Sequence, residues 1–444
     1  MTSGTPLFDA LRAHLALGRS SFHTPGHKGA PGFFPDRLEA FDLTELPDTD
    51  SLFEAEGAIL EAERAAARLF GTARTLFSAG GCTLCIQAML RLAVPEGGEI
   101  LSGRIIHRSA VQTMALLDLK PHWVMPRPDA GEGLPGRVWA EDVCAALRAH
   151  PGIRAVYLTS PDYYGVLADL PAIAEVCREH GVPLLVDNAH GAHLGFVGGG
   201  LHPVARGASM AACSAHKTLP VLTGGAYLNI ADGRFAPEAK AAMALFGSTS
   251  PSYPVLLSLD LCRAWLEREG RTAFARLEER VCSLREFARS LGLGLPAGLC
   301  DPVRLTLRTA DIGLTGVEAA ERFRSMGVEP EYADGAFVVL LPTPMNGEED
   351  FARLEGALRA LPRGKGIRAR GICVPPPVPV LTPRQALFAS SEPLPLEQAV
   401  GRVAAETACP CPPGVPVVMP GEKITREAAE FLSGYGIRGL PVVK

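Results

Sequence analysis

The middle third of the chain alternates short apolar runs with runs of helix-forming residues, and this alternation restricts the fold most strongly. The apolar runs "RAVYLTS" (154–160), "VPLLVD" (182–187) and "GAYLNI" (225–230) predict buried strands. Between the first two, "DLPAIAEVCREHG" (169–181) begins with a capping Asp169, has proline in its first turn and ends in glycine, which predicts a helix. Strands alternating with helices indicate an α/β fold, with a mostly parallel sheet and helices on both faces.

The pattern differs on either side of this region. Residues 1–53 are rich in proline, glycine and phenylalanine without a long period, so we expect an arm that lies over another part of the protein. We assign 54–265 to a large domain and 266–444 to a smaller C-terminal α+β domain. Within the latter, the proline-rich but apolar stretch 409–422 is expected to cover a cavity.

Charge and cysteine usage exclude several classes of function. The 444 residues carry a formal net charge of −5 with no basic stripe, so neither nucleic acid nor a membrane surface is an expected partner. We find no signal-peptide pattern and no apolar run of the ~18 residues that a membrane span needs. Cys82 and Cys85 lack a second pair at zinc spacing, so no metal is expected and the thiols indicate a reducing cytoplasm.

A glycine turn follows the first apolar run of the large domain. In "FSAGGCTLC", Gly80 and Gly81 allow a tight turn between a strand and a helix. The amides of Cys82 and Thr83 would then open the helix, where unpaired N–H groups bind phosphate well. Glycines are common in such turns, so this signal alone is weak.

Two charged residues follow apolar segments farther along. Asp187 ends "VPLLVD", where a carboxylate partly removed from water needs a cationic partner; the competing interpretation is a helix cap. Lys217, in "SAHKTLP", follows the strand-like "ASMAAC", and an apolar pocket would lower its pKa and make it a nucleophile. A phosphate seat, a carboxylate and a lysine together fit pyridoxal 5′-phosphate (PLP).

These residues lie in segments that resemble the PLP-dependent ornithine/lysine/arginine decarboxylases of the aspartate-aminotransferase fold, fold type I. The similarity extends over almost the whole chain, and its first and fourth segments together are highly specific. The matching segments are "FHTPGHKG" (22–29), "DLTELPDTDSL" (42–52), "VDNAHGAH" (186–193), "SAHKTLPVLTGGAYL" (214–228), "STSPSYPVLLSLD" (248–260) and "PPGVPVVMPGE" (412–422).

The resemblance implies roles for individual residues. Lys217 corresponds to the Schiff-base lysine, and Asp187 to the partner of the ring nitrogen. His107 would stack on one face of the ring and Ala189 on the other, with His190 near the ring oxygen. The residues implied for the phosphate are Gly81, Cys82, Thr83, Ser214 and His216 from the same chain, and Ser248 and Thr249 from the neighbour in a homodimer.

The expected activity is therefore decarboxylation of arginine, lysine or ornithine, as in polyamine biosynthesis. Glu406 and Glu422 are candidate acids for the distal cation of the substrate. The chain departs from the family at Cys82, where threonine is usual, and at Cys411, where tyrosine is usual; it also has no counterpart of the N-terminal wing domain of the long enzymes. These differences leave the choice of substrate open.

Two other functions fit parts of the pattern. An aminotransferase or lyase on the same fold is the main alternative. An aminotransferase would need an arginine for the α-carboxylate, for which Arg304 and Arg368 are candidates. A non-enzymatic PLP carrier or sensor is less consistent with the presence of both Lys217 and Asp187.

Overall fold

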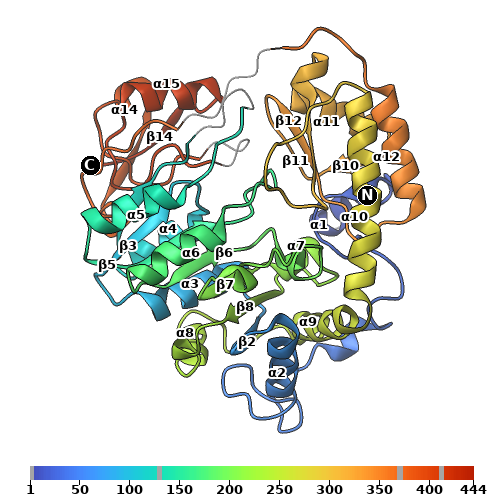
Figure 1. Ribbon diagram of the computed structural model, residues 1–444, viewed down its shortest axis with the longest axis horizontal. Helices are drawn as coiled ribbons and strands as arrows, with labels where there is room; N and C mark the ends of the chain where they lie inside the picture. The colour runs from blue at the N-terminus through green and yellow to red at the C-terminus, as the bar shows by residue number, and fades with distance from the viewer. Residues whose placement is uncertain (1–4, 128–132, 368–373, 410–414) are drawn as a thin grey trace.

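The computed structural model describes residues 5–127, 133–367, 374–409 and 415–444, and its largest sheet there has seven strands (Figure 1). Their order is β2-β8-β7-β6-β5-β3-β4, and β8 runs in the direction opposite to the other six. The bounds are β2 Arg74–Ser78, β3 Glu99–Gly103, β4 Lys120–Val124, β5 Ile153–Thr159, β6 Leu184–Asp187, β7 Met210–Cys213 and β8 Ala226–Ile230. The mostly parallel α/β sheet is confirmed.

Helices cover both faces of this sheet because its strands alternate between two apolar surfaces. On β5, Val156 and Leu158 pack with helices α5 and α6, whereas Ala155 and Tyr157 pack with α3 and α4. The helices of this part are α2 Ala58–Phe70, α3 Gly81–Ala93, α4 Arg108–Leu116, α5 Ala140–Ala149, α6 Leu170–Glu179, α7 Ala215–Thr218, α8 Ala239–Ala244 and α9 Tyr253–Trp265.

Local signals set the ends of α6 as the sequence predicts. The Asp169 side chain accepts the Ala172 amide at 3.3 Å, and Pro171 occupies the first turn, where no amide donor is needed. Gly181, at φ +67°, follows the last turn in the left-handed region that favours glycine.

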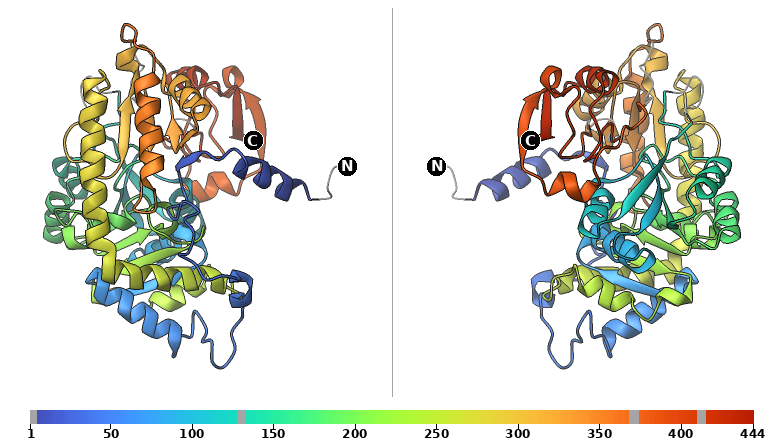
Figure 2. Two further views of the ribbon diagram at one scale, coloured as in Figure 1. Left: turned by 90° about the vertical axis from the view of Figure 1, so that its right-hand side faces the viewer. Right: turned by 90° about the vertical axis from the view of Figure 1, so that its left-hand side faces the viewer.

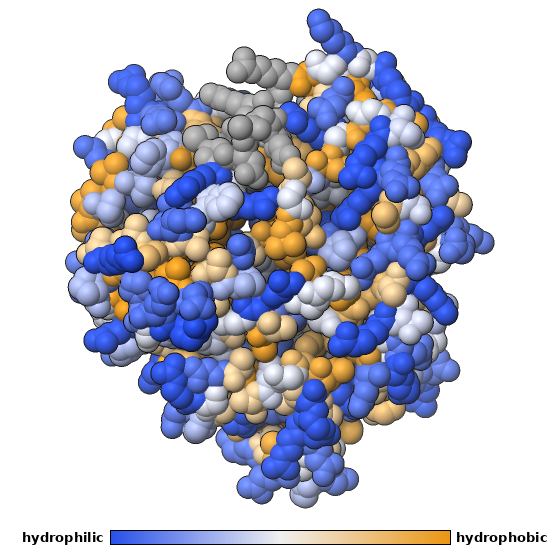
Figure 3. All heavy atoms as spheres, viewed as in Figure 1, coloured by the Kyte–Doolittle hydropathy of each residue, from blue (hydrophilic) through white to orange (hydrophobic). Residues whose placement is uncertain are grey.

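A second part of the chain builds on a long helix. From α9 the chain passes through one π-helical turn, Leu266–Gly270, into α10, Arg271–Ser290. A three-stranded antiparallel sheet, β11-β12-β9, packs with two helices beside it. The bounds are β9 Leu305–Arg308, α11 Gly316–Ser325, β10 Val328–Pro330, β11 Tyr332–Ala333, β12 Phe337–Leu340 and α12 Glu348–Ala360. On the face shown in Figure 3, polar residues cover much of the side where α10 and α12 lie.

The end of the chain forms a third layer beside the large sheet (Figure 1). Its elements are α13 Pro383–Leu387, β13 Ser391–Pro395, α14 Leu396–Ala399, α15 Arg426–Gly434 and β14 Gly439–Val443, with β13 and β14 antiparallel. Short 3-10 turns connect the elements of the whole chain at Leu38–Phe41, Ala192–Gly195, Pro203–Arg206, Gly233–Phe235 and Thr309–Ile312. No helix in the described ranges combines the length and apolar character needed to cross a membrane.

The N-terminal segment differs in part from its prediction. Residues Pro6–Leu15 form helix α1, which we did not expect from a stretch without a long apolar period. Its side chains are exposed, and Figure 2 shows the helix projecting from the body. Farther along, β1, Ser20–Phe22, pairs in parallel with β10, and the Gly26 amide donates to the His216 carbonyl at 2.7 Å. This part of the arm does lie over another element.

Candidate functional site

The carboxyl ends of two neighbouring parallel strands carry the central pair of residues. Asp187 is the last residue of β6, and Lys217 lies in α7, the short helix that follows β7. Because Asp187 is in register with Ala212 of β7, both side chains start at the same edge of the sheet. Their charges are close enough to shift each other's pKa, so the structure brings this pair together.

Asp187 is a buried carboxylate surrounded by neutral donors. Its Oδ2 accepts from the Tyr157 hydroxyl at 3.2 Å, and its Oδ1 accepts from the Ala189 amide at 3.1 Å. The next helical turn begins at Ala192 with Gly191 as its cap, so the alternative of a helix cap is wrong. Burial raises the pKa of Asp187, and the positive charges of Lys217 and His107 oppose this shift.

Lys217 is half-buried. Its Nζ lies 3.0 Å from Nε2 of His190, and burial lowers the pKa of the ammonium although Asp187 partly offsets that effect. Burial and the neighbouring Lys217 charge also push the pKa of His190 well below 6.5. His190 is therefore a neutral imidazole within hydrogen-bond distance of the amine.

The arrangement fits PLP on its charges. Within the described ranges, buried Asp187 and half-buried Lys217 are groups of opposite charge that form no direct ion pair with each other or with another residue. Buried charges left in this state are costly. A protonated ring nitrogen facing Asp187 and an aldehyde joined to Lys217 would remove that cost at both ends.

The predicted phosphate seat is held together by backbone hydrogen bonds. Gly81, at φ +68°, donates its amide to the Gly224 carbonyl at 2.8 Å, which ties the β2–α3 turn to the loop before β8. His216 Nδ1 lies 3.1 Å from the Gly225 carbonyl in the same loop, and buried Ser214 precedes α7. The amides of Cys82 and Thr83 lie in the first turn of α3, where no carbonyl of that helix can accept from them.

The Cys82 side chain points elsewhere. Its buried Sγ lies 4.0 Å from Oδ1 of Asp187, while the side chain of Thr83 is exposed. Burial, with the Asp187 charge adding to it, raises the pKa of this thiol well above its usual value, so it remains an S–H group. Only the amide of Cys82 is left for a phosphate.

Of the other predicted residues, His107 and Ala189 interact with Asp187, whereas Ser248 and Thr249 lie elsewhere in the chain. His107 caps α4, with its Nδ1 2.8 Å from the Ser109 hydroxyl; burial lowers its pKa and Asp187 opposes that shift. Ala189 lies two residues beyond Asp187 and donates its amide to that carboxylate. Ser248 and Thr249 are exposed in the loop between α8 and α9, and a single chain does not bring them to these residues.

Sequence reasoning missed an acidic residue beside Lys217. Glu331 follows β10, and its negative charge raises the pKa of Lys217. One carboxylate oxygen accepts from the Thr24 amide at 2.8 Å, and the other accepts from the Tyr163 hydroxyl at 3.3 Å. The Tyr163 ring lies 4.7 Å from that of His190. No local pattern marks Glu331, because its position depends on how β10 pairs with the N-terminal arm.

Of the acids and arginines that we considered from the sequence, Glu422 and Arg304 are bonded to other parts of the protein. Both oxygens of Glu422 accept from Arg104, at 2.6 and 2.7 Å, in a buried pair, whereas Glu406 is exposed. Arg304 donates to the carbonyls of Tyr163 and His190 at 2.8 and 3.0 Å. Arg368 and Cys411 lie outside the described residues.

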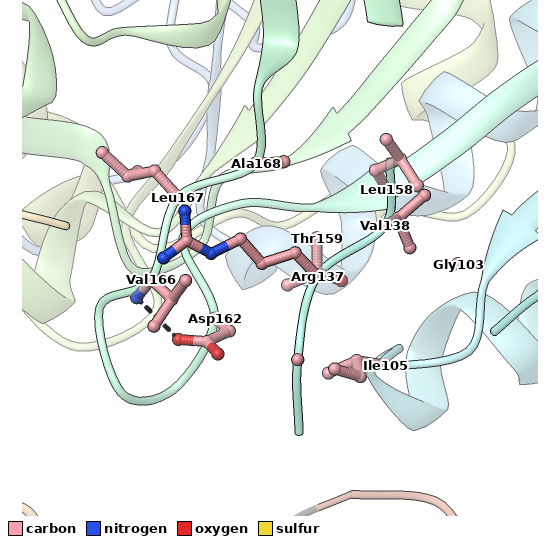
Figure 4. Close-up of a pocket in the computed structure, with 11 residues that line it drawn as sticks. Gly103, Ile105, Arg137, Val138, Leu158, Thr159, Asp162, Val166, Leu167 and Ala168 are labelled. Carbon is pink, nitrogen blue, oxygen red and sulfur yellow. Dashed lines mark hydrogen bonds between the residues drawn. The ribbon is translucent and has the colours of Figure 1, made fainter. Parts of the chain in front are cut away.

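Two cavities near these residues are unsuited to the cofactor or the substrate. The first, of about 40 Å³, lies beneath the β5–α6 loop, where Asp162 accepts the Val166 amide at 2.8 Å (Figure 4). It is too small for PLP. The second, of about 230 Å³, is lined by Arg285, Arg289 and Arg304 and by one acid, Asp301, so its net positive charge repels a basic amino acid.

Comparison with known proteins gives a consistent result. The sequence profile "Orn/Lys/Arg decarboxylase, major domain" matches residues 5–294, and the profile of the C-terminal domain matches 369–435. The arginine decarboxylases of Bacillus subtilis and Bacillus anthracis are each 31% identical and cover 99% of this chain, which spans 95% and 94% of their lengths. The structure of the Escherichia coli constitutive lysine decarboxylase superposes with a TM-score of 0.76 at 20% identity, covering 99% of this chain and 82% of its own.

Proposed function

Because the chain belongs to the Orn/Lys/Arg decarboxylase family, whose members are PLP-dependent carboxy-lyases, we propose that the basic amino acid it decarboxylates is arginine. The observation that carries the proposal is full-length similarity to arginine decarboxylases at 31% identity. Glu331 supports it, since a carboxylate beside Lys217 offers two oxygens to a planar guanidinium.

We place the cofactor as follows. Lys217 would hold its aldehyde covalently, Asp187 would face its ring nitrogen, and His107 and Ala189 would contact the two ring faces, with His190 near the ring oxygen. The phosphate ligands in this proposal are Gly81, Cys82, Thr83, Ser214 and His216, with the first three acting through the α3 turn. When bound, PLP supplies an electron sink for the pair of electrons left as CO2 departs.

The protein's own contribution is electrostatic. A buried, ionised Asp187 favours a proton on the facing ring nitrogen, because a positive charge there offsets the cost of burying the carboxylate. Lys217, with its lowered pKa, releases a proton more readily than an exposed lysine and can exchange with the substrate amine. His190, being neutral, lies within hydrogen-bond distance of that amine without adding a positive charge.

The distal end of the substrate would meet Glu331. Its oxygens already accept the Thr24 amide and the Tyr163 hydroxyl, so the carboxylate is fixed in orientation before substrate arrives. A substrate with a neutral side chain would leave this charge unpaired, and the enzyme would reject it. Glu331 thus replaces Glu406 and Glu422 as the acid proposed for the distal cation.

We also propose a homodimer that acts in the cytoplasm in polyamine biosynthesis. Exposed apolar residues on α1, among them Leu7 at 71% and Leu15 at 77%, support burial against a second copy. In that dimer Ser248 and Thr249 would reach the phosphate of the neighbour. The buried thiols of Cys82, Cys85 and Cys213 are free, which agrees with a reducing compartment.

The test is a substrate panel. Purified holoenzyme is incubated with arginine, lysine and ornithine, and the amines are separated by chromatography. Agmatine should dominate, and Glu331→Gln should lower kcat/KM for arginine by about 100-fold, as expected when the partner of a substrate charge is removed from a half-buried site. Glu329→Gln, which alters the neighbouring acid that pairs with Arg19 and Arg324, is the matched control. Cadaverine or putrescine as the main product would overturn the choice of arginine.

A further inference from the structure

Asp187 has a hydrogen-bond partner that no predicted site residue accounts for. Tyr157 lies in the middle of β5, and its hydroxyl donates to Asp187 Oδ2 at 3.2 Å. Its side chain is fully buried, among apolar residues of the α3 face of the sheet. A phenol placed there needs a hydrogen-bond partner, and the carboxylate supplies it.

We propose that Tyr157 is a positioning residue that keeps the Asp187 carboxylate ionised and turned toward the cofactor nitrogen, with the Cys82 thiol as a weaker second support. This inference rests on the cofactor placement proposed above.

The geometry gives each oxygen of Asp187 its own donors. Tyr157 fixes Oδ2 from the neighbouring strand, and the Ala189 amide fixes Oδ1 from the chain that follows. The Cys82 thiol approaches Oδ1 at 4.0 Å from the start of α3. Donors on three separate segments leave the carboxylate little freedom to rotate.

Both side-chain donors are restricted to that role. Burial, with the Asp187 charge adding to it, raises the pKa of Tyr157 well above 10, so the phenol keeps its proton at any working pH. The thiol likewise keeps its proton. Each therefore stabilises the charged form of Asp187 and cannot take the proton that Asp187 is proposed to hold on the ring.

The departure from the family at position 82 acquires an explanation here. A threonine hydroxyl would be available to the phosphate, whereas the Cys82 thiol is buried against Asp187. The residue thus gives its amide to the phosphate seat and its side chain to the carboxylate.

The test replaces Tyr157 by phenylalanine in the holoenzyme reconstituted with PLP labelled with ¹⁵N in the ring, and follows the nitrogen resonance as pH is varied. Loss of a hydrogen bond to a charged group changes an equilibrium by about ten- to hundred-fold, so the ring nitrogen should lose its proton at a pH lower by about one to two units. Cys82→Ala should shift it in the same direction by less.

Tyr227→Phe is the matched control. Tyr227 is also a fully buried tyrosine of the large sheet, but its hydroxyl donates to the Leu259 carbonyl at 2.7 Å. Both tyrosine variants should lose some thermal stability, and only Tyr157→Phe should move the nitrogen titration. A titration of Tyr157→Phe that coincides with that of Tyr227→Phe would overturn the inference. Because this readout needs only bound cofactor, it is independent of whether the wild-type enzyme forms agmatine.

Discussion

Two pairs of opposite charges in this protein, one pair fully buried and the other partly so, are arranged in contrasting ways. Arg104, at the end of β3, and Glu422, in the C-terminal layer, meet in a two-pronged ion pair that joins these two parts. Asp187 and Lys217 lie at one sheet edge, and each is bonded to neutral groups instead. Compensated charges fix the structure, whereas charges without direct partners leave a place for a ligand that carries the complementary groups.

The largest expected effect is at Lys217, the proposed Schiff-base lysine. Lys217→Ala should abolish the visible absorption of the bound cofactor and lower kcat by about four orders of magnitude or more. Absorption spectra and amine formation measure this. Unchanged absorption in this variant would mean that Lys217 does not bind the cofactor. Charges without direct partners would then not mark a ligand site in this protein.

A smaller effect is expected at the ion pair between Arg104 and Glu422. Glu422→Leu leaves Arg104 buried without its partner and should lower the free energy of unfolding by about 3–5 kcal/mol. Combining it with Arg104→Met should restore most of that stability, because no buried charge then remains. Urea unfolding of the two single variants and the double variant measures the coupling, and additive losses would contradict a direct pair.

The smallest expected effect is a change in the free energy of unfolding with pH. In the cofactor-free protein, burial lowers the pKa of Lys217 below its ordinary 10.5. At a pH between this lowered pKa and 10.5, the pKa of Lys217 in the unfolded chain, the unfolded chain binds more protons at Lys217 than the folded protein does. The free energy of unfolding should therefore rise with pH in that window. Wild-type protein should be less stable than Lys217→Met, and the difference should narrow as pH approaches 10.5. A difference independent of pH would show that the ammonium is not buried as described.

The sequence was sufficient for features that depend on neighbouring residues. The strands around Asp187, the capped helix α6 and the position of Lys217 after β7 all follow from short patterns. Glu331 and Tyr157 could not be found this way. Glu331 reaches the site through the pairing of β10 with β1, and Tyr157 reaches Asp187 across the gap between two strands.

The remaining misses have similar causes. Helix α1 forms from residues with adequate helix propensity, although its apolar positions find no partner in the single chain, so burial gave no guide to it. Glu422 was considered as a substrate ligand because the sequence does not show that Arg104, more than 300 positions earlier, already binds it.

The N-terminal arm links the α10–α12 region to the segment that carries Lys217. Phe22 ends the strand paired with β10, and only four residues later Gly26 bonds to the His216 carbonyl next to Lys217. The Gly26 carbonyl also accepts from Thr343 at 2.8 Å, and a Cβ at position 26 would lie 2.5 Å from the Leu219 carbonyl oxygen. A separation of four residues between these contacts leaves little room for them to move apart. A rotation of the α10–α12 region would therefore pull directly on the backbone next to Lys217, the proposed Schiff-base lysine, giving motion of that region a mechanical route to the proposed site.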